Sequence, residues 1–302
     1  MRRAMVKKRQ YVNLYDSVSV MYTLREPGFT IPWTQAVLRL RRSSDSDQKY
    51  VFFDTNGEIS LTSFTGNTPT VASAVTLATW VGANNAQVAI WEGLTPNNTI
   101  DTNLSVVQGT AGNQPTFITA GVIEVKNSLV AIDFLNSSRY LSASGGNPDL
   151  NDGNSYTILT VTATDDSTTN NVILNTRLAS GGVSDRFVIY NDRRTNKLQS
   201  VIKNSLGTNQ IQTYTAQENT ANQKLQTVIG TPTNLKGYYN GTLQQNVAVT
   251  DTYTNDTTQI GIDRGTSNPF DGTMQEIIIF PTDKTSDLVA LHAEINAYYS
   301  IY

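Results

Sequence analysis

Few side chains of this 302-residue sequence are able to carry out nucleophilic, acid–base or metal chemistry. It has no cysteine, so thiolate nucleophiles, disulfides and thiolate metal sites are excluded. Its one histidine, His292, lies in a stretch where Leu288, Leu291, Ile295 and Tyr298 recur at helical spacing. We expect His292 to pack beside that apolar stripe, which argues against a histidine triad and a zinc site.

The remaining candidates for chemistry are carboxylates and tyrosines. Glycoside hydrolysis needs two carboxylates that flank a sugar, and Glu276 is the carboxylate within the most apolar strand-like run. We expect a structural role for Glu276 and no catalytic residues. Calcium is an open alternative, with Asp251, Asp256 and Asp263 as weak candidates, although turn formation explains aspartates in loops equally well.

Tyrosines and amides are the groups that would recognise a glycan. Tyr238, Tyr239 and Tyr253 lie among many Asn and Gln residues and are our candidate glycan platform. Ordinary packing of tyrosine on a sheet face is the competing interpretation.

The elements that would position these groups are mostly strands. The chain is rich in Thr, Asn and Ser, contains 20 Gly and 14 Tyr, and only 16% of its residues are charged. Asn240-Gly241 predicts a two-residue hairpin because both residues tolerate positive φ. The run Ile277 to Phe280 predicts a strand buried on both faces, and a helix is expected over 287–298. Together these features predict an all-β sandwich with a short C-terminal helix.

Three segments in this order carry a resemblance. They are 235–241, ending in Asn-Gly, then Ile260-Gly261, then 270–280 with its Phe-Asp-Gly start. In combination they resemble the laminin-G-like, concanavalin A-like jelly roll of the type found in bacteriophage structural proteins. The resemblance extends back to 129–134 and 156–163, and it implies a jelly-roll domain over 113–302.

A smaller β-rich region is expected over 14–112. Its segments 22–26 and 38–45 resemble a block found in front of such jelly rolls, including the N-terminal catalytic domain of the arabinofuranosidase B family. Relatives usually carry Trp-Tyr-Asp-Gln-Ser-Gly there, whereas this chain has Ala-Ile-Trp-Glu-Gly at 89–93. Arg39, Arg41 and Arg42 alternate with leucines and predict a strand with one charged face, which is solvated or paired between subunits, or else binds an anion.

The first 13 residues form a basic arm. Arg2, Arg3, Lys7, Lys8 and Arg9 contrast with a formal net charge of −3 for the whole chain. We expect this arm to bind other virion proteins or a neighbouring subunit, and an acidic body makes nucleic acid an unlikely partner. No apolar stretch approaches the roughly 18 residues of a membrane span, and no secretory signal is evident.

The resemblance implies a non-enzymatic virion protein of a bacteriophage, made in the host cytoplasm. Such a protein would be part of a capsid, spike or fibre, as a homo-oligomer that displays a lectin-like sandwich for assembly, decoration and attachment to host glycans. A carbohydrate-active enzyme, of an arabinofuranosidase-like glycoside hydrolase type, is the alternative. No cofactor is expected, and calcium is the one alternative left open.

Overall fold

A computed structural model describes most of the chain between residue 14 and residue 302. The described residues are 14–26, 28, 33–135, 139–143, 150, 154–164, 171–177, 186–192, 197–203, 209–217, 222–249, 257–263 and 268–302. The basic arm, Tyr253, Asp251 and Asp256 therefore lie outside the described residues.

The N-terminal part contains short strands and two short helices. Its elements are β1 (Val20–Thr23), β2 (Leu38–Arg42), β3 (Gln48–Val51), β4 (Thr65–Gly66), α1 (Leu77–Val81), β5 (Ala86–Trp91), β6 (Leu94–Thr95), β7 (Thr99–Ile100), β8 (Val106–Val107), the 3₁₀ helix η1 (Ala111–Asn113) and β9 (Thr116–Thr119). The strands β4, β3, β2 and β5 pair in that order, and β5 continues to β8 and β9.

The C-terminal part contains the longer strands. Its elements are β10 (Val122–Ile123), β11 (Val125–Lys126), β12 (Leu129–Val130), β13 (Ile132–Asp133), β14 (Leu141–Ala143), β15 (Tyr156–Thr164), β16 (Asn171–Arg177), β17 (Arg186–Asp192), β18 (Lys197–Lys203), β19 (Asn209–Gln217), β20 (Lys224–Gly230), β21 (Asn234–Tyr239), β22 (Thr242–Ala248), β23 (Thr257–Ile260), β24 (Gly272–Phe280) and α2 (Leu288–Tyr299).

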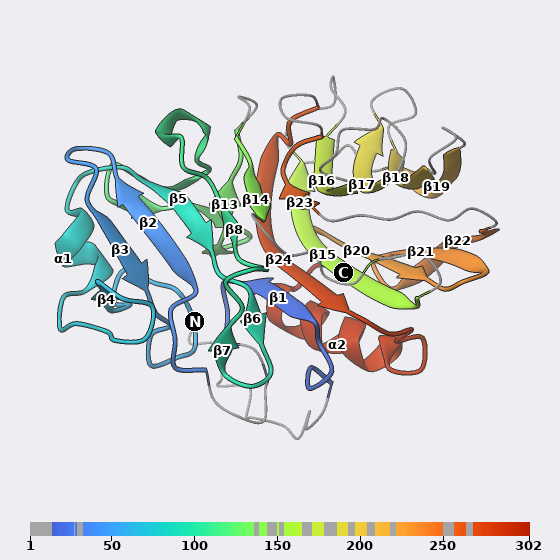
Figure 1. Cartoon of the computed structure of the whole chain (residues 1–302), viewed down its shortest axis with the longest axis horizontal. Helices are drawn as coiled ribbons and strands as arrows, with labels where there is room; N and C mark the ends of the chain where they lie inside the picture. Colours follow the sequence, from blue (N-terminus) through green and yellow to red (C-terminus); the bar gives the residue numbers. More distant parts are fainter. Residues whose placement is uncertain are drawn as a thin grey trace.

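These longer strands form two antiparallel layers. One layer has the order β1–β24–β15–β20–β21–β22, and the other has the order β14–β23–β16–β17–β18–β19. Figure 1 shows β16 to β19 on one side of β20 to β22, with α2 on the other. The expected all-β, concanavalin A-like jelly-roll sandwich with a C-terminal helix is thus confirmed.

Strand β24 is the centre of its layer. All nine of its residues are buried, as are all nine of its neighbour β15. One edge of β24 pairs with β15, and the other pairs with β1 and then β13. Strands covered on both faces are typically rich in apolar residues, and the apolar run Ile277 to Phe280 is buried throughout, so the prediction made from it is confirmed.

Two glycines occupy positions that other residues would strain. Asn240 and Gly241 have φ of 45° and 79° and connect Tyr239 directly to Thr242, which confirms the two-residue hairpin. Gly261 follows the end of β23 with φ of 85°, and a Cβ there would lie 2.5 Å from the Phe134 ring. An aromatic ring therefore approaches the backbone closely at Gly261, just after the strand ends, where a side chain would not fit.

Hydrogen bonds cross the expected domain boundary at residue 112. Strand β1 pairs with β24, and β8 pairs with β14. The division into 14–112 and 113–302 stays a prediction, but the N-terminal strand β1 is a member of the sandwich layer itself.

Helix α2 packs against the layer that contains β20 and β21. Its buried face includes Leu291, Ile295 and His292. The His292 Nε2 atom lies 2.8 Å from the Thr227 hydroxyl, and the ring meets Tyr238 edge-on at 6.0 Å between centroids. His292 is the packed residue that the sequence predicted. Among the described residues, no helix has both the length and the apolar character needed to cross a membrane.

This packing predicts a specific loss of stability in acid. Burial lowers the pKa of His292 to about 4, whereas an unfolded histidine has a pKa of about 6.5. Between these values the unfolded chain binds a proton that the folded chain does not. The free energy of unfolding should therefore fall by about 2–3 kcal/mol as the pH drops from 6.5 to 4.

Urea unfolding of the wild type and of His292→Gln between pH 7 and pH 4 measures this effect. Glutamine can still bond to Thr227 but does not titrate, so the variant should lose less stability over this range. Parallel pH profiles for the two proteins would show that His292 does not cause the loss.

Candidate functional site

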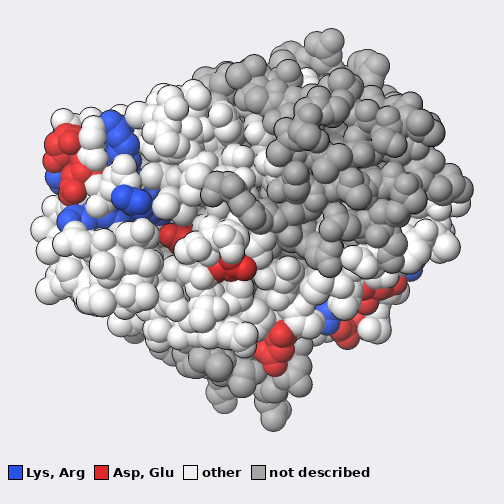
Figure 2. Space-filling model, viewed as in Figure 1, with Lys and Arg blue, Asp and Glu red and all other residues white. Residues whose placement is uncertain are grey.

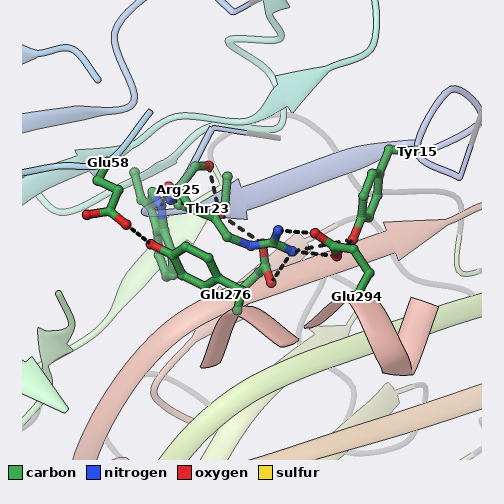
Figure 3. Close-up of polar contacts among 8 residues, drawn as sticks. Tyr15, Thr23, Arg25, Glu58, Glu276 and Glu294 are labelled. Atoms are coloured by element: carbon green, nitrogen blue, oxygen red, sulfur yellow. Dashed lines mark hydrogen bonds and ion pairs between the residues drawn. The ribbon is translucent and has the colours of Figure 1, made fainter. Parts of the chain in front are cut away.

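A buried cluster of charged residues joins three distant parts of the chain (Figure 3). Arg25 follows β1, Glu276 lies in β24, and Glu294 lies in α2. Arg25 Nε and Nη2 donate to the two Glu276 oxygens at 3.0 and 3.1 Å. Arg25 Nη1 and Nη2 donate to the two Glu294 oxygens at 2.5 and 3.1 Å. One guanidinium thus binds two carboxylates, each through both of its oxygens.

Local structure brings these groups together. Thr23 of β1 pairs directly with Glu276 in the register of the sheet, so Arg25 emerges two residues beyond that pairing. The Thr23 hydroxyl donates to Glu276 Oε1 at 2.9 Å. Tyr15 donates its hydroxyl proton to Glu294 Oε2. Each carboxylate therefore has a hydroxyl donor in addition to the guanidinium.

Aromatic rings enclose the guanidinium. Its central carbon lies 5.1 Å from the ring centroid of Tyr298 and 5.7 Å from that of Tyr299, distances at which a cation is attracted to a ring face. The Tyr298 hydroxyl donates to Glu58 Oε1 at 3.1 Å. Arg25 is 5% exposed, and Glu276 is 0% exposed. The charges are therefore held away from solvent.

Burial and pairing act differently on the two carboxylates. Burial is the largest influence on Glu276 and raises the pKa of its carboxyl, with Arg25 opposing it. Burial also opposes ionisation of Glu294, but Arg25 and the Tyr15 hydrogen bond together keep its pKa below the ordinary value. The carboxylates raise the pKa of Arg25, which outweighs the desolvation that lowers it. The guanidinium consequently stays charged.

This geometry does not suit glycoside hydrolysis. An acid and a nucleophile must face the sugar from opposite sides of the scissile bond. Glu276 has no exposed surface, and it shares Arg25 with Glu294. The cluster instead links β1, β24 and α2, which agrees with the structural role expected for Glu276.

A small cavity lies beside the cluster. It has a volume of about 40 Å³, and its lining includes Glu58, Ser128, Tyr298 and Tyr299. The Tyr299 hydroxyl is buried and has no hydrogen-bond partner among the residues that the structure describes. A cavity of this size has room for water but not for a sugar ring, since ligand pockets span roughly 300–1,000 Å³.

A second buried carboxylate lies in the 89–93 segment, where the sequence departs from its relatives. Glu92 is 3% exposed, and burial raises the pKa of its carboxyl. The Ser105 hydroxyl donates to Glu92 Oε2 at 2.7 Å and accepts from the Gly93 N–H at 3.1 Å. This short network closes the turn after β5.

The structure separates the candidate glycan tyrosines. Tyr238 and Tyr239 are adjacent in β21, so their side chains point to opposite faces of the sheet. The Tyr238 ring faces His292 of α2, while Tyr239 packs against the core. Tyr238 and Tyr239 do not form one platform, because consecutive side chains of a strand point to opposite faces of the sheet. Tyr253 lies outside the described residues.

Only one of the three calcium candidates, Asp263, lies among the described residues. Asp263 is 6% exposed, and Asp251 and Asp256 are outside the described residues. No group of three or more His, Asp or Glu side chains suited to a metal occurs within the described ranges. Calcium binding by Asp263 therefore stays a prediction.

Sequence reasoning missed Arg25 and Glu294. A signal for each was present, since Glu276 interrupts an apolar strand and Glu294 occupies a helical position three residues after Leu291. A carboxylate buried in a central strand requires a cation. Nothing local indicates which cation, because Arg25 is 251 residues away from Glu276.

We predict that Arg25→Met destabilises the fold by about 3–5 kcal/mol, because it leaves two carboxylates without their cation. Adding Glu276→Gln should restore part of this loss by removing one unpaired charge. Arg41→Met, at a surface position, is the matched control and should change stability by about 0.5 kcal/mol or less. Urea unfolding followed by tryptophan fluorescence measures all three, and equal stability of the two Arg→Met variants would contradict the role of Arg25.

Comparison with known proteins identifies the fold and no family. No protein-family model matches the chain, and no curated protein matches its sequence. Solved structures do match. A GH54 α-L-arabinofuranosidase soaked with a cyclic sulfate inhibitor superimposes with a TM-score of 0.59 at 11% identity, over 93% of this chain and 62% of that one.

A second arabinofuranosidase, complexed with arabinofuranosyl-α-1,2-xylobiose, gives a TM-score of 0.54 at 12% identity, over 91% of this chain and 62% of that one. This chain therefore spans about 62% of the length of either enzyme. At such identity the likeness shows a shared β-sandwich fold.

Proposed function

We propose that this protein is a non-catalytic, carbohydrate-binding β-sandwich displayed on a bacteriophage particle. The observation that supports glycan binding most directly is the fold likeness over 93% of the chain to an arabinofuranosidase. A comparable enzyme was solved with a bound arabinofuranosyl-xylobiose. The pairing of Glu276 and Glu294 with one arginine argues against these two carboxylates as a catalytic pair, because both are bound to the same guanidinium.

The virion role rests on the basic arm and on the resemblance to phage structural proteins. The arm adjoins a firmly held segment, since Tyr15 is 1% exposed, stacks on Phe280 at 6.4 Å and bonds to Glu294. A basic segment that adjoins so fixed a residue in the sequence suits docking on acidic partner proteins. Homo-oligomeric display would then multiply a weak glycan affinity.

An arabinofuranosidase-like hydrolase is the second candidate. The same fold likeness favours it, because both enzymes superimpose on nearly the whole of this chain. Fold alone does not decide between binding and catalysis, so the two candidates need a direct test.

Binding and hydrolysis can be measured on the same arabinose-containing polysaccharides. We predict binding with a dissociation constant near the millimolar scale for the monomer and roughly 10²-fold tighter binding for a multimerised protein. No reducing sugar should be released from arabinan or arabinoxylan. Release that disappears when one carboxylate is replaced would establish the enzyme instead, and failure of every multimer to bind a glycan array would remove the binding function.

The arm can be tested separately. Deletion of residues 1–12 should leave a folded protein that no longer joins particles or multimers, because its basic contacts are lost. A variant with Arg2, Arg3, Lys7, Lys8 and Arg9 changed to Gln keeps the length and should behave like the deletion. Normal incorporation of both proteins would defeat the anchoring role.

A further inference from the structure

Three arginines of β2 have unequal environments. Arg42 is fully engaged within the protein. Its Nε and Nη2 donate to the two Asp45 oxygens at 3.0 and 2.5 Å, and its guanidinium lies 5.3 Å from the Trp80 ring centroid. This arginine holds the tip of the β2–β3 hairpin against α1.

Arg39 and Arg41 lie on the outer face of β2. Among the described residues, neither has a carboxylate partner like the Asp45 of Arg42. Within the described part of the chain, no carboxylate oxygen comes within 4.0 Å of either guanidinium. Arg41 Nη2 donates to the neutral Ser46 hydroxyl at 2.6 Å, and Arg39 lies over the Tyr50 ring at 5.3 Å. Both are half-buried, so their positions are held while their charges are not neutralised by an ion pair.

The nearby Glu92 does not change this. Arg39 acts to lower the pKa of that carboxyl, but burial outweighs the effect and leaves the pKa raised. Glu92 already accepts from Ser105. Glu92 acts on Arg39 only from a distance, because in the described part of the chain the two side chains form no ion pair within 4.0 Å.

The sheet register places three polar residues beside the two arginines, with Ile90 of β5 directly opposite Arg39. Arg39 is directly opposite Tyr50, and Arg41 is directly opposite Gln48 on β3 and Gln87 on β5. Residues directly opposite in a sheet share a face. Figure 2 shows Lys and Arg side chains gathered over the β2–β3 hairpin, with acidic side chains at its tip.

We infer that this face, defined by Arg39, Arg41, Gln48, Tyr50 and Gln87, binds the carboxylates of an acidic polysaccharide. The inference rests on the proposed glycan-binding function and names its ligand class. A guanidinium presents paired N–H groups that match a carboxylate. Amide and phenol groups beside it suit sugar hydroxyls, so the face has partners for both parts of a uronic acid.

Charge distribution favours a polysaccharide over nucleic acid. A duplex carries one charge per roughly 1.7 Å and needs many cations along its path. Here two arginines that form no ion pair among the described residues are followed by Asp45 and Asp47 at the hairpin tip, on a chain with a formal net charge of −3. Well-spaced carboxylates, one to a sugar, match two cations better than a continuous polyanion does.

Affinity electrophoresis of the full chain in gels containing polygalacturonate, neutral dextran or double-stranded DNA tests the inference. Polygalacturonate should retard the wild type, and added salt should weaken the effect by screening. Arg39→Gln/Arg41→Gln should bind about tenfold or more weakly. Lys49→Gln removes a charge from the same hairpin at the position opposite buried Leu40 and should bind like the wild type.

The outcomes separate this inference from the proposed function. Undiminished polygalacturonate binding by the double variant, or retardation by DNA alone, would overturn the acidic-polysaccharide site. If neutral glycans bind and polygalacturonate does not, glycan binding stands and the inference fails. Circular dichroism of the double variant, matched to the wild type, confirms that lost binding is not lost folding.

Discussion

The neutralisation of Glu276 is the constraint on which the rest of this structure depends. A carboxylate in the middle of a fully buried strand is costly unless a cation and hydrogen-bond donors surround it. Arg25 and Thr23 meet that requirement from β1, and Glu294 of α2 balances the second half of the guanidinium. Strand β1 and helix α2 therefore belong to the sandwich as firmly as its long strands do. The N-terminal region cannot detach from the jelly roll without exposing this cluster.

The need to neutralise Glu276 also sets its carboxylate apart from those that a glycosidase uses for catalysis. Two carboxylates lie close together here, as they do in a glycosidase, yet both oxygens of each are bound to one guanidinium. These ion pairs hold β1, β24 and α2 together. Aromatic residues are used similarly, since Tyr298 and Tyr299 cover Arg25 and Tyr238 covers His292. Groups that suggest catalysis or sugar stacking in the sequence are thus largely occupied by internal contacts.

The polar groups that we propose for ligand binding lie away from this cluster, on the outer face of β2. There Arg42 stabilises a hairpin through Asp45, whereas Arg39 and Arg41 form no ion pair with any described residue. An arginine held by packing but not neutralised loses little freedom on binding an anion, which is the advantage of preorganisation.

The sequence by itself determined the features that depend on neighbouring residues. Asn240-Gly241 specified its hairpin through positive φ, the run Ile277 to Phe280 specified a buried strand, and the Leu291–Ile295 spacing specified the helix. Tertiary structure alone decided that Arg25 meets Glu276 and that Tyr238, and not Tyr239, faces α2. It also decided that Arg42 forms an ion pair, whereas Arg39 and Arg41 form none with the residues that the structure describes. The physical reason is that burial, ion pairing and ring contacts depend on segments brought together across hundreds of residues, whereas turn and period signals are local.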